Sequence, residues 1–233
     1  VDITGSVKFD VVVDDAQRSK AMELKAQLIT DSGFEELSAG LMRFVWIAAS
    51  THQGEEEVLL NAHQILLEKF PDSLLVLVPR HPERFNAVAA MIDSYGLRAV
   101  RRSEKKTPLV GLQDQLLLVD SMGELADFYG VADIAFIGGS LVPVGGHNYL
   151  EASAWGLPVL TGPHRHNFVA IANQLETIGG LTVVRNAEDL AAQLVLAIEQ
   201  PRTIRERGSN VIDFLAKNRG ATEKLFERIQ MLL

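Results

Sequence analysis

Short runs of apolar residues alternate with longer segments of helical periodicity along most of the chain. The apolar runs span residues 44–49, 74–78, 115–119, 134–137, 158–160 and 181–184, and the segments after them span 54–70, 82–95, 122–130, 148–155, 168–178 and 187–199. Nearly unbroken apolar strands are typical of a parallel sheet covered by helices on both faces. Because such crossovers are right-handed, the pattern predicts a Rossmann-like, doubly wound α/β fold.

The two ends of the chain depart from this alternation. Residues 1–42 contain a poorly alternating run and one helical segment at 14–30, and the weakest predicted strand is 98–102. Residues 201–233 predict two helices that meet near Gly220, a residue type that commonly ends helices. The second helix has a set of apolar residues that either remain uncovered here or pack as the apolar face of an ordinary amphipathic helix. They are Leu225, Phe226, Ile229 and Leu232.

Composition narrows the class of protein. The chain has 233 residues, 47% of them hydrophobic, which is enough to bury a core. The absence of cysteine excludes disulfides, thiolate metal sites and cysteine nucleophiles. A net charge of −8 argues against a nucleic-acid partner and against electrostatic docking on anionic lipid. No apolar run approaches the length of about 18 residues that a transmembrane helix needs.

Two glycine-rich turns follow the apolar run 134–137. Gly138-Gly139-Ser140 comes first, and Gly145-Gly146-His147-Asn148 leads into a helical segment that contains Glu151. This order of strand, glycines and helix brings backbone N–H groups against a phosphate at the carboxyl edge of a parallel sheet. Glu151 can accept hydrogen bonds from sugar hydroxyls. The alternative interpretation is a surface loop with a flexible tip.

The first strong strand runs into the sequence Ser50-Thr51-His52-Gln53-Gly54-Glu55-Glu56. Ser50 can cap the next helix or bind an anion, and Gly54 permits close approach of the backbone to a ligand. Both interpretations stay open for these two residues. For Glu55 and Glu56 we favour a structural role, as acidic residues at the start of a helix.

The next strand ends in Pro79-Arg80-His81-Pro82-Glu83-Arg84. We expect this stiff turn to hold the Arg80 guanidinium over a cleft, where a planar cation can stack on a base and pair with phosphate or carboxylate. Pro82 suits a helix start. Arg84 is interpreted as a surface charge or the partner of a glutamate, so Arg80 is the strongest cationic candidate.

Ser121-Met122-Gly123-Glu124-Leu125 follows the strand predicted at 115–119. The Met122 side chain and the neighbouring amides can wall a nucleobase, although a core methionine is the simpler interpretation of Met122 alone. His147, His164 and His166 lack the spacing of a closed zinc site, so we expect no metal.

Five motifs occur in a fixed order along the chain. They are Gly5-Ser6-Val7-Lys8-Phe9-Asp10, the segment Ala49 to Glu56, the segment Pro79 to Arg84, the segment Ser121 to Leu125, and the stretch from Gly145 to His164. Together they resemble the donor half of 3-deoxy-D-manno-octulosonic acid (Kdo) transferases, GT-B-fold enzymes of lipopolysaccharide synthesis. The family often has Asn where Ser6 stands, which leaves the role of Ser6 open. The resemblance implies a missing acceptor half on the amino-terminal side, and the chain begins at Val1 as a cut fragment would.

The resemblance implies transfer of Kdo from CMP-Kdo to a lipid A precursor, lipid IVA, at the cytoplasmic face of the bacterial inner membrane, without a metal or other cofactor. It implies an interdomain segment (1–42), a donor-binding domain (43–200) and C-terminal helices (201–233) that cross toward the missing half. The general base belongs to that half, so this chain should bind donor without turning it over and should not itself contact the membrane. The expected donor-binding residues are Lys8, Ser50, Gly54, Pro79, Arg80, His81, Met122, Gly123, Gly139, Ser140, Gly145, Gly146, His147, Asn148 and Glu151. Lys8 is included only because the resemblance implies it.

Two other classes of protein are compatible with the same pattern. One is a different GT-B glycosyltransferase or a sugar-nucleotide epimerase, which would prefer uridine or guanosine nucleotides. The other is a non-catalytic nucleotide-binding module. Fold alone does not separate them, because one fold serves many functions.

Overall fold

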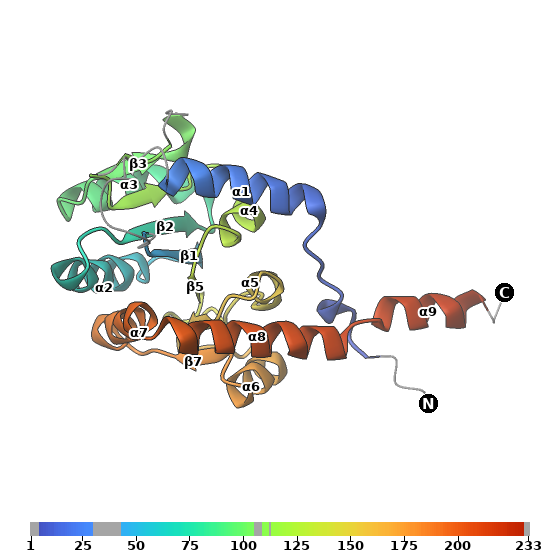
Figure 1. Cartoon of the computed structure of the whole chain (residues 1–233). Helices are drawn as coiled ribbons and strands as arrows, with labels where there is room; N and C mark the ends of the chain where they lie inside the picture. The colour runs from blue at the N-terminus through green and yellow to red at the C-terminus, as the bar shows by residue number, and fades with distance from the viewer. Residues whose placement is uncertain (1–4, 30–42, 105–108, 112, 231–233) are drawn as a thin grey trace.

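The computed structural model describes residues 5–29, 43–104, 109–111 and 113–230. Its strands are β1 (Val45–Thr51), β2 (Leu74–Pro79), β3 (Ala99–Arg101), β4 (Leu116–Leu118), β5 (Ile134–Ile137), β6 (Val159–Thr161) and β7 (Leu181–Val183). Within the described residues they form one parallel sheet of seven strands in the order β3-β4-β2-β1-β5-β6-β7 (Figure 1). The predicted doubly wound α/β fold is confirmed, and the weakest predicted strand lies at the sheet edge as β3.

Helices cover both faces of this sheet. They are α1 (Asp15–Ile29), α2 (Glu56–Lys69), α3 (Phe85–Ser94), α4 (Leu125–Tyr129), α5 (Leu150–Ala154), α6 (Val169–Thr177), α7 (Ala187–Glu199), α8 (Pro201–Asn218) and α9 (Ala221–Gln230), with short 3₁₀ turns η1 (Val7–Phe9), η3 (Pro82–Arg84) and η4 (Arg102–Glu104). Buried side chains of α2, α3 and α7 pack on one face, and those of α1, α4, α5, α6 and α8 pack on the other. Along β1, Val45 and Ile47 face the second group while Trp46 faces the first, because strand side chains alternate.

The strand order sets the place of a ligand site. From β1 the chain proceeds to β2 on one side, and it later continues from β5 on the other side. Trp46 of β1 lies opposite Leu75 of β2 and Ile134 of β5. Ligands of open α/β sheets bind outside the carboxyl ends of the strands at such a reversal. A ligand site is therefore expected where β1 and β5 end.

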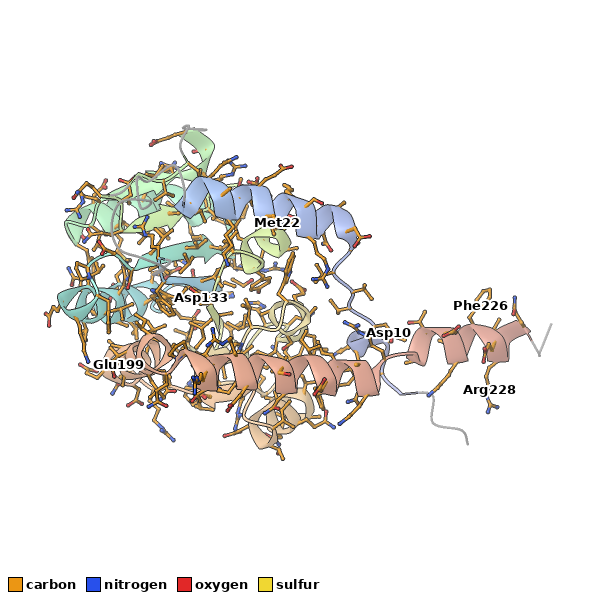
Figure 2. The ribbon with its side chains drawn as sticks, viewed as in Figure 1. Asp10, Met22, Asp133, Glu199, Phe226 and Arg228 are labelled. Carbon is orange, nitrogen blue, oxygen red and sulfur yellow. The ribbon has the colours of Figure 1, made fainter. Side chains whose placement is uncertain are left out.

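The last helix extends away from the rest of the domain (Figures 1 and 2). Three of its apolar side chains are solvent-exposed: Leu225 by 45%, Phe226 by 60% and Ile229 by 48%. The uncovered-face interpretation is confirmed for these three, whereas Leu232 lies outside the described residues. Asp10 holds the start of α9, because its carboxylate accepts the Gly220 N–H and the Thr222 N–H, both at 2.7 Å.

A buried histidine joins α2 to the sheet and gives a pH prediction. His63 Nδ1 accepts a hydrogen bond from Trp46 Nε1 at 3.2 Å, and His63 Nε2 lies 2.8 Å from the Gln115 carbonyl oxygen. A neutral ring with its proton on Nε2 satisfies both contacts. Burial lowers the pKa of His63 to about 4.

We expect the free energy of unfolding to fall as the pH is lowered from about 6.5 to about 4. Below pH 6.5 the unfolded His63 binds a proton. The folded His63 does not bind one until its own pKa is reached, so acid favours unfolding. Within this window the His63 contribution is at most about 1.4 kcal/mol per pH unit. Urea unfolding of the wild type and His63→Gln at several pH values measures it, and equal slopes for the two proteins would contradict the assignment.

Candidate functional site

Most of the predicted site residues lie beyond the carboxyl ends of neighbouring strands. Pro79 ends β2 and is followed by Arg80 and His81, while the glycine turns follow β5. Met122 and Gly123 follow β4, which is the strand beyond β2. The sheet thus collects at one edge three segments that are far apart in sequence, because each of them follows a parallel strand.

Three imidazoles meet where β1, β2 and β5 end. His147 Nε2 lies 2.7 Å from His52 Nε2, with the two rings stacked 5.0 Å apart, and His81 meets the His52 ring edge-on at 5.1 Å. A hydrogen bond between two ring nitrogens has a proton on only one of them. Burial first, then the charges of His52, Arg80 and His81, lower the pKa of His147 to about 4. The motifs predicted His147 and His81 for the site but not His52, although His52 belongs to the same motif as Ser50.

The amides of the first glycine turn do not face an open site. Glu55 is completely buried, and its carboxylate accepts hydrogen bonds from Gly139 N at 2.7 Å and from Ser140 N at 2.9 Å. Ser140 is also completely buried, and its hydroxyl donates to the Ile137 carbonyl. The expectation that these amides bind an external phosphate is therefore wrong for Gly139 and Ser140, since an internal carboxylate already occupies them.

The second glycine turn is built on the first. The Gly145 and Gly146 N–H groups donate to the Gly139 carbonyl at 2.9 and 2.7 Å, and both glycines have left-handed backbone angles. The following helix, α5, begins only at Leu150. The helix predicted from residue 148 therefore begins two residues later, after a loop of His147, Asn148 and Tyr149, and the glycine pair does not open it directly.

Asn148 and Glu151 form a polar pair at the start of α5. Asn148 Nδ2 donates to Glu151 Oε1 at 3.0 Å, and Asn148 Oδ1 accepts the Leu150 N–H at 3.1 Å. Both side chains are only partly buried. In the described part of the chain, no protein group donates a hydrogen bond to the second carboxylate oxygen of Glu151. This arrangement can offer a fixed acceptor to a sugar hydroxyl.

The structure corrects the interpretation of Glu56 and decides between the two alternatives for Arg84. Glu56 is completely buried, and Arg84 binds it through two bonds, Nη1 to Oε1 at 2.5 Å and Nη2 to Oε2 at 3.1 Å. Thr51 Oγ1 adds a third bond to Oε1 at 3.0 Å. Glu55 and Glu56 are thus buried anions with fixed partners, not merely acidic residues that favour a helix start. For Arg84 the glutamate-partner alternative is confirmed.

Ser50 and Gly54 are both held in left-handed backbone conformations. Ser50 has φ 56°, is 8% exposed and lies at an irregularity in the pairing of β1 with β2. Helix α2 is capped at Glu55, so the capping interpretation of Ser50 is wrong. A non-glycine residue at positive φ is strained, and such strain gathers at functional sites. Gly54 has φ 91° and is exposed, as close approach of a ligand would require.

Met122 and Lys8 lie on either side of the segments that follow β1, β2 and β5 at the carboxyl edge of the sheet. Met122 is 63% exposed, so the core-methionine interpretation is wrong and its side chain is free to contact a base. The neighbouring Gly123 is exposed as well, at φ 84°. Lys8 is exposed on η1, with its Nζ 5.0 Å from the centre of the Phe168 ring. Because Phe168 follows β6, this contact brings Lys8 to the carboxyl edge of the sheet.

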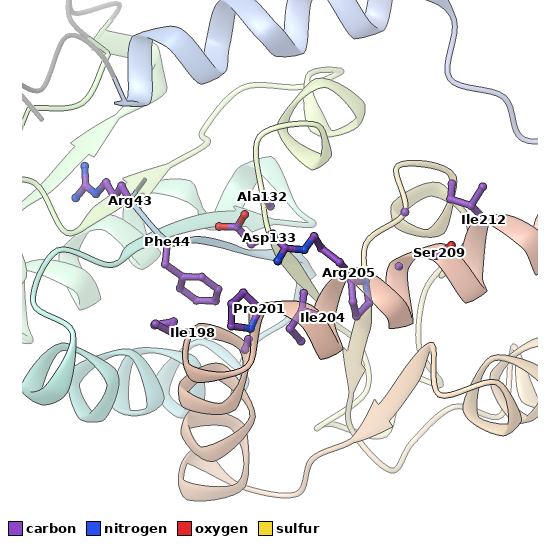
Figure 3. A pocket seen from close by; sticks show the side chains of 14 residues that line it. Arg43, Phe44, Ala132, Asp133, Ile198, Pro201, Ile204, Arg205, Ser209 and Ile212 are labelled. Atoms are coloured by element: carbon purple, nitrogen blue, oxygen red, sulfur yellow. The ribbon is translucent and has the colours of Figure 1, made fainter. Parts of the chain in front are cut away.

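A cavity of about 670 Å³ lies at the opposite edge of the sheet, before β1, β5 and β6. Phe44, Pro201 and Ile204 form apolar walls, with Asp133 nearby, while the Arg43 guanidinium points away from them (Figure 3). Asp133 Oδ2 accepts the Val45 N–H at 2.8 Å, and burial raises the pKa of Asp133. The glycine turns, the imidazoles and Arg80 all lie at the other edge, which we therefore favour as the functional site.

The part of the chain that the structure describes shows neither a metal site nor a membrane-spanning helix. No group of three or more His, Cys, Asp or Glu side chains there is arranged to hold a metal ion. No helix within the described ranges combines the length and apolar character needed to cross a membrane.

Residues 42–212 match the family described as "Glycosyl transferases group 1". The fold agrees with the solved structure of Anabaena Alr3699/HepE in complex with UDP-glucose, with a TM-score of 0.61 at 16% identity over 95% of this chain and 55% of that one. At that identity the likeness concerns the fold alone. The family match covers most of the chain, which therefore belongs to the group 1 glycosyl transferases.

More specific relatives are the Kdo transferases. The 3-deoxy-D-manno-octulosonic acid transferase of Haemophilus influenzae is 41% identical over 100% of this chain and 52% of that protein, and the Bordetella pertussis enzyme is 32% identical over 98% and 51%. The C-terminal CMP-Kdo binding domain of WaaA from Acinetobacter baumannii has a TM-score of 0.77 at 29% identity, covering 87% of this chain and 99% of that domain. These relatives confirm the resemblance that the five motifs predicted. The chain spans about half the length of the curated relatives it matches.

Proposed function

We propose that this chain is the donor-binding domain of a glycosyltransferase that moves Kdo from CMP-Kdo to a lipid A precursor in lipopolysaccharide synthesis. The observation that carries the proposal is the convergence of Arg80, the imidazoles around His147 and the Asn148–Glu151 pair at the β1/β5 reversal. The similarity to a CMP-Kdo binding domain at a TM-score of 0.77 supports cytidine as the base.

Each residue of the site has a chemical task in this proposal. Arg80 and Lys8 bring positive charge to the phosphate and to the sugar carboxylate, two anions on one donor. As CMP departs it gains negative charge, which these cations stabilise. Glu151 accepts from the ribose hydroxyls, and Met122 lies against the base. Gly139 and Ser140 act indirectly, because their amides bind Glu55 and not the donor.

The acceptor and its activation belong to other parts of the whole protein in this proposal. A general base must take the proton of the acceptor hydroxyl, and we assign it outside this chain. The exposed apolar face of Leu225, Phe226 and Ile229 on α9 suits contact with that other part. Lipid IVA as acceptor and the cytoplasmic face of the bacterial inner membrane as location are further elements of the proposal. The chain alone should bind donor without turnover.

Calorimetric titration with CMP, UMP, GMP and ADP tests the proposed function. We expect CMP to bind more tightly than the other three nucleotides. Equal or tighter binding of UMP would instead support another sugar-nucleotide enzyme of the same fold. Binding of none of them would overturn the assignment of a nucleotide donor.

Arg80→Ala should weaken binding of CMP more than binding of cytidine. Arg80 is exposed at the site, and a charge-assisted hydrogen bond to phosphate contributes about 1.5–3 kcal/mol. Titrations of both ligands measure the difference. Arg202→Ala, which removes an exposed arginine of α8, is the matched control and should leave both affinities unchanged. An equal loss for nucleoside and nucleotide would show that Arg80 stacks on the base or supports the fold.

A further inference from the structure

The carboxylate of Glu55 is an internal anion with a complete set of donors. Its Oε2 accepts the His52 N–H at 2.9 Å and the Gly139 N–H at 2.7 Å, while its Oε1 accepts the Ser140 and Leu141 N–H groups, both at 2.9 Å. Two bonds on each oxygen match the acceptor capacity of an ionised carboxylate. The side chain is completely buried. One anion therefore joins the loop after β1 to the loop after β5.

The glycine turn is shaped to admit this carboxylate. A Cβ atom added to Gly138 would lie 2.9 Å from Glu55 Oε2, 2.5 Å from the Ser50 carbonyl oxygen and 2.8 Å from Thr51 Cα. Any side chain at this position would thus separate the turn from Glu55 and from β1. The lack of a side chain at Gly138 therefore supports the close fit between the end of β5 and Glu55, and it does so independently of the hydrogen bonds.

Hydrogen bonds continue from the turn that Glu55 holds to the segment that carries the proposed donor contacts. The Gly139 carbonyl accepts the Gly145 and Gly146 N–H groups, and the Gly145 carbonyl accepts the Asn167 N–H at 3.0 Å. Gly146 directly precedes His147, whose ring contacts His52. The position of His147 and Asn148 therefore depends on where Glu55 fixes Gly139.

We propose that Glu55 is a positioning residue for donor binding: it fills the anion-binding amides of the glycine turn and thereby places the Gly145–Glu151 segment against the donor. This inference rests on the proposed function. The charge of Glu55 is essential to it, because Glu55→Gln replaces one acceptor oxygen with an NH₂ group that faces two N–H donors. The turn must then move, and the donor contacts move with it.

Glu56→Gln supplies a matched control. Glu56 is the next residue, is equally buried and has comparable hydrogen bonding, but its partners are Arg84 and Thr51 and not the glycine turn. Both variants should lower the melting temperature of the chain. Only Glu55→Gln should also weaken CMP binding, on the order of tenfold, because misplacement of supporting groups lowers affinity even without a lost contact.

The experiment measures both variants and the wild type at a temperature at which circular dichroism shows all three folded. Calorimetry gives the CMP affinity, and amide hydrogen exchange by NMR reports on Gly145 and Gly146 without any ligand. We expect faster exchange at these two amides in Glu55→Gln and wild-type exchange in Glu56→Gln.

Two results would overturn the inference: equal losses of CMP affinity in the two variants, or unchanged exchange at Gly145 and Gly146 in Glu55→Gln. If the wild type itself does not bind CMP, the proposed function fails. The proposed role of Glu55 in donor binding fails with it, while the exchange data still show whether Glu55 positions the turn.

Discussion

Arg84→Ala should lower the free energy of unfolding by about 3–5 kcal/mol, the usual effect of removing one partner of a buried ion pair. The Glu56 side chain has no solvent exposure, and the Arg84 side chain has 17%. The substitution leaves the Glu56 carboxylate buried, with the Thr51 hydroxyl as its remaining hydrogen-bond donor among the described residues. Chemical denaturation of the two proteins measures the change.

A double-mutant cycle is the control for this prediction. Arg84→Ala combined with Glu56→Gln removes the uncompensated charge as well as the pair. The double variant should therefore be less destabilised than the sum of the two single variants, since contacting residues couple. Purely additive effects, or a loss below about 1 kcal/mol for Arg84→Ala as is typical of exposed pairs, would show that the ion pair does not stabilise the fold.

Gly138→Ala should destabilise the chain by about 3 kcal/mol and abolish measurable CMP binding, because overpacking a site bounded by backbone forces strands apart. The added Cβ would lie 2.5 Å from the Ser50 carbonyl oxygen and 2.8 Å from Thr51 Cα, atoms that no side-chain rotation can move. Urea unfolding and calorimetry measure the two effects.

Gly111→Ala is the matched control for Gly138→Ala. Among the described residues, the added Cβ would contact the Asp114 side chain alone, at 3.3 Å from Oδ2, and Gly111 lies outside the proposed site. Gly111→Ala should change the free energy of unfolding and the CMP affinity much less than Gly138→Ala does. A Gly138→Ala variant with the wild-type free energy of unfolding and the wild-type CMP affinity would contradict the tight fit between β1, β5 and Glu55.

The fold could be predicted because the pattern of apolar and polar residues within each short segment determines whether that segment forms a strand or a helix. Each apolar run became a strand, and the helical segments between them became helices, since a strand buried on both faces and an amphipathic helix leave different periods in the sequence. Even the weak strand β3 was placed, and its edge position with partly exposed Ala99 and Arg101 explains why its apolar signal is weak.

The site could be predicted only in outline. The order of strands and motifs indicated that these segments meet at one edge of the sheet, because strand ends determine which segments meet. They could not indicate that Glu55 is buried, since its partners Gly139 and Ser140 are 84 and 85 residues further along the chain. An acidic residue at a helix start has the same local pattern whether it faces water or fills a nest of amides. The same limit applies to Glu56, whose partner Arg84 is 28 residues away.

The most direct test of the central claim is a map of amide NMR shifts on titration with CMP. We predict saturable changes at His52, Arg80 and the Gly145–Glu151 segment, where β1, β2 and β5 end. UMP should produce the same pattern only at higher concentration. Changes confined to Phe44, Asp133 and Ile204, which line the cavity at the opposite edge, would contradict the proposed site.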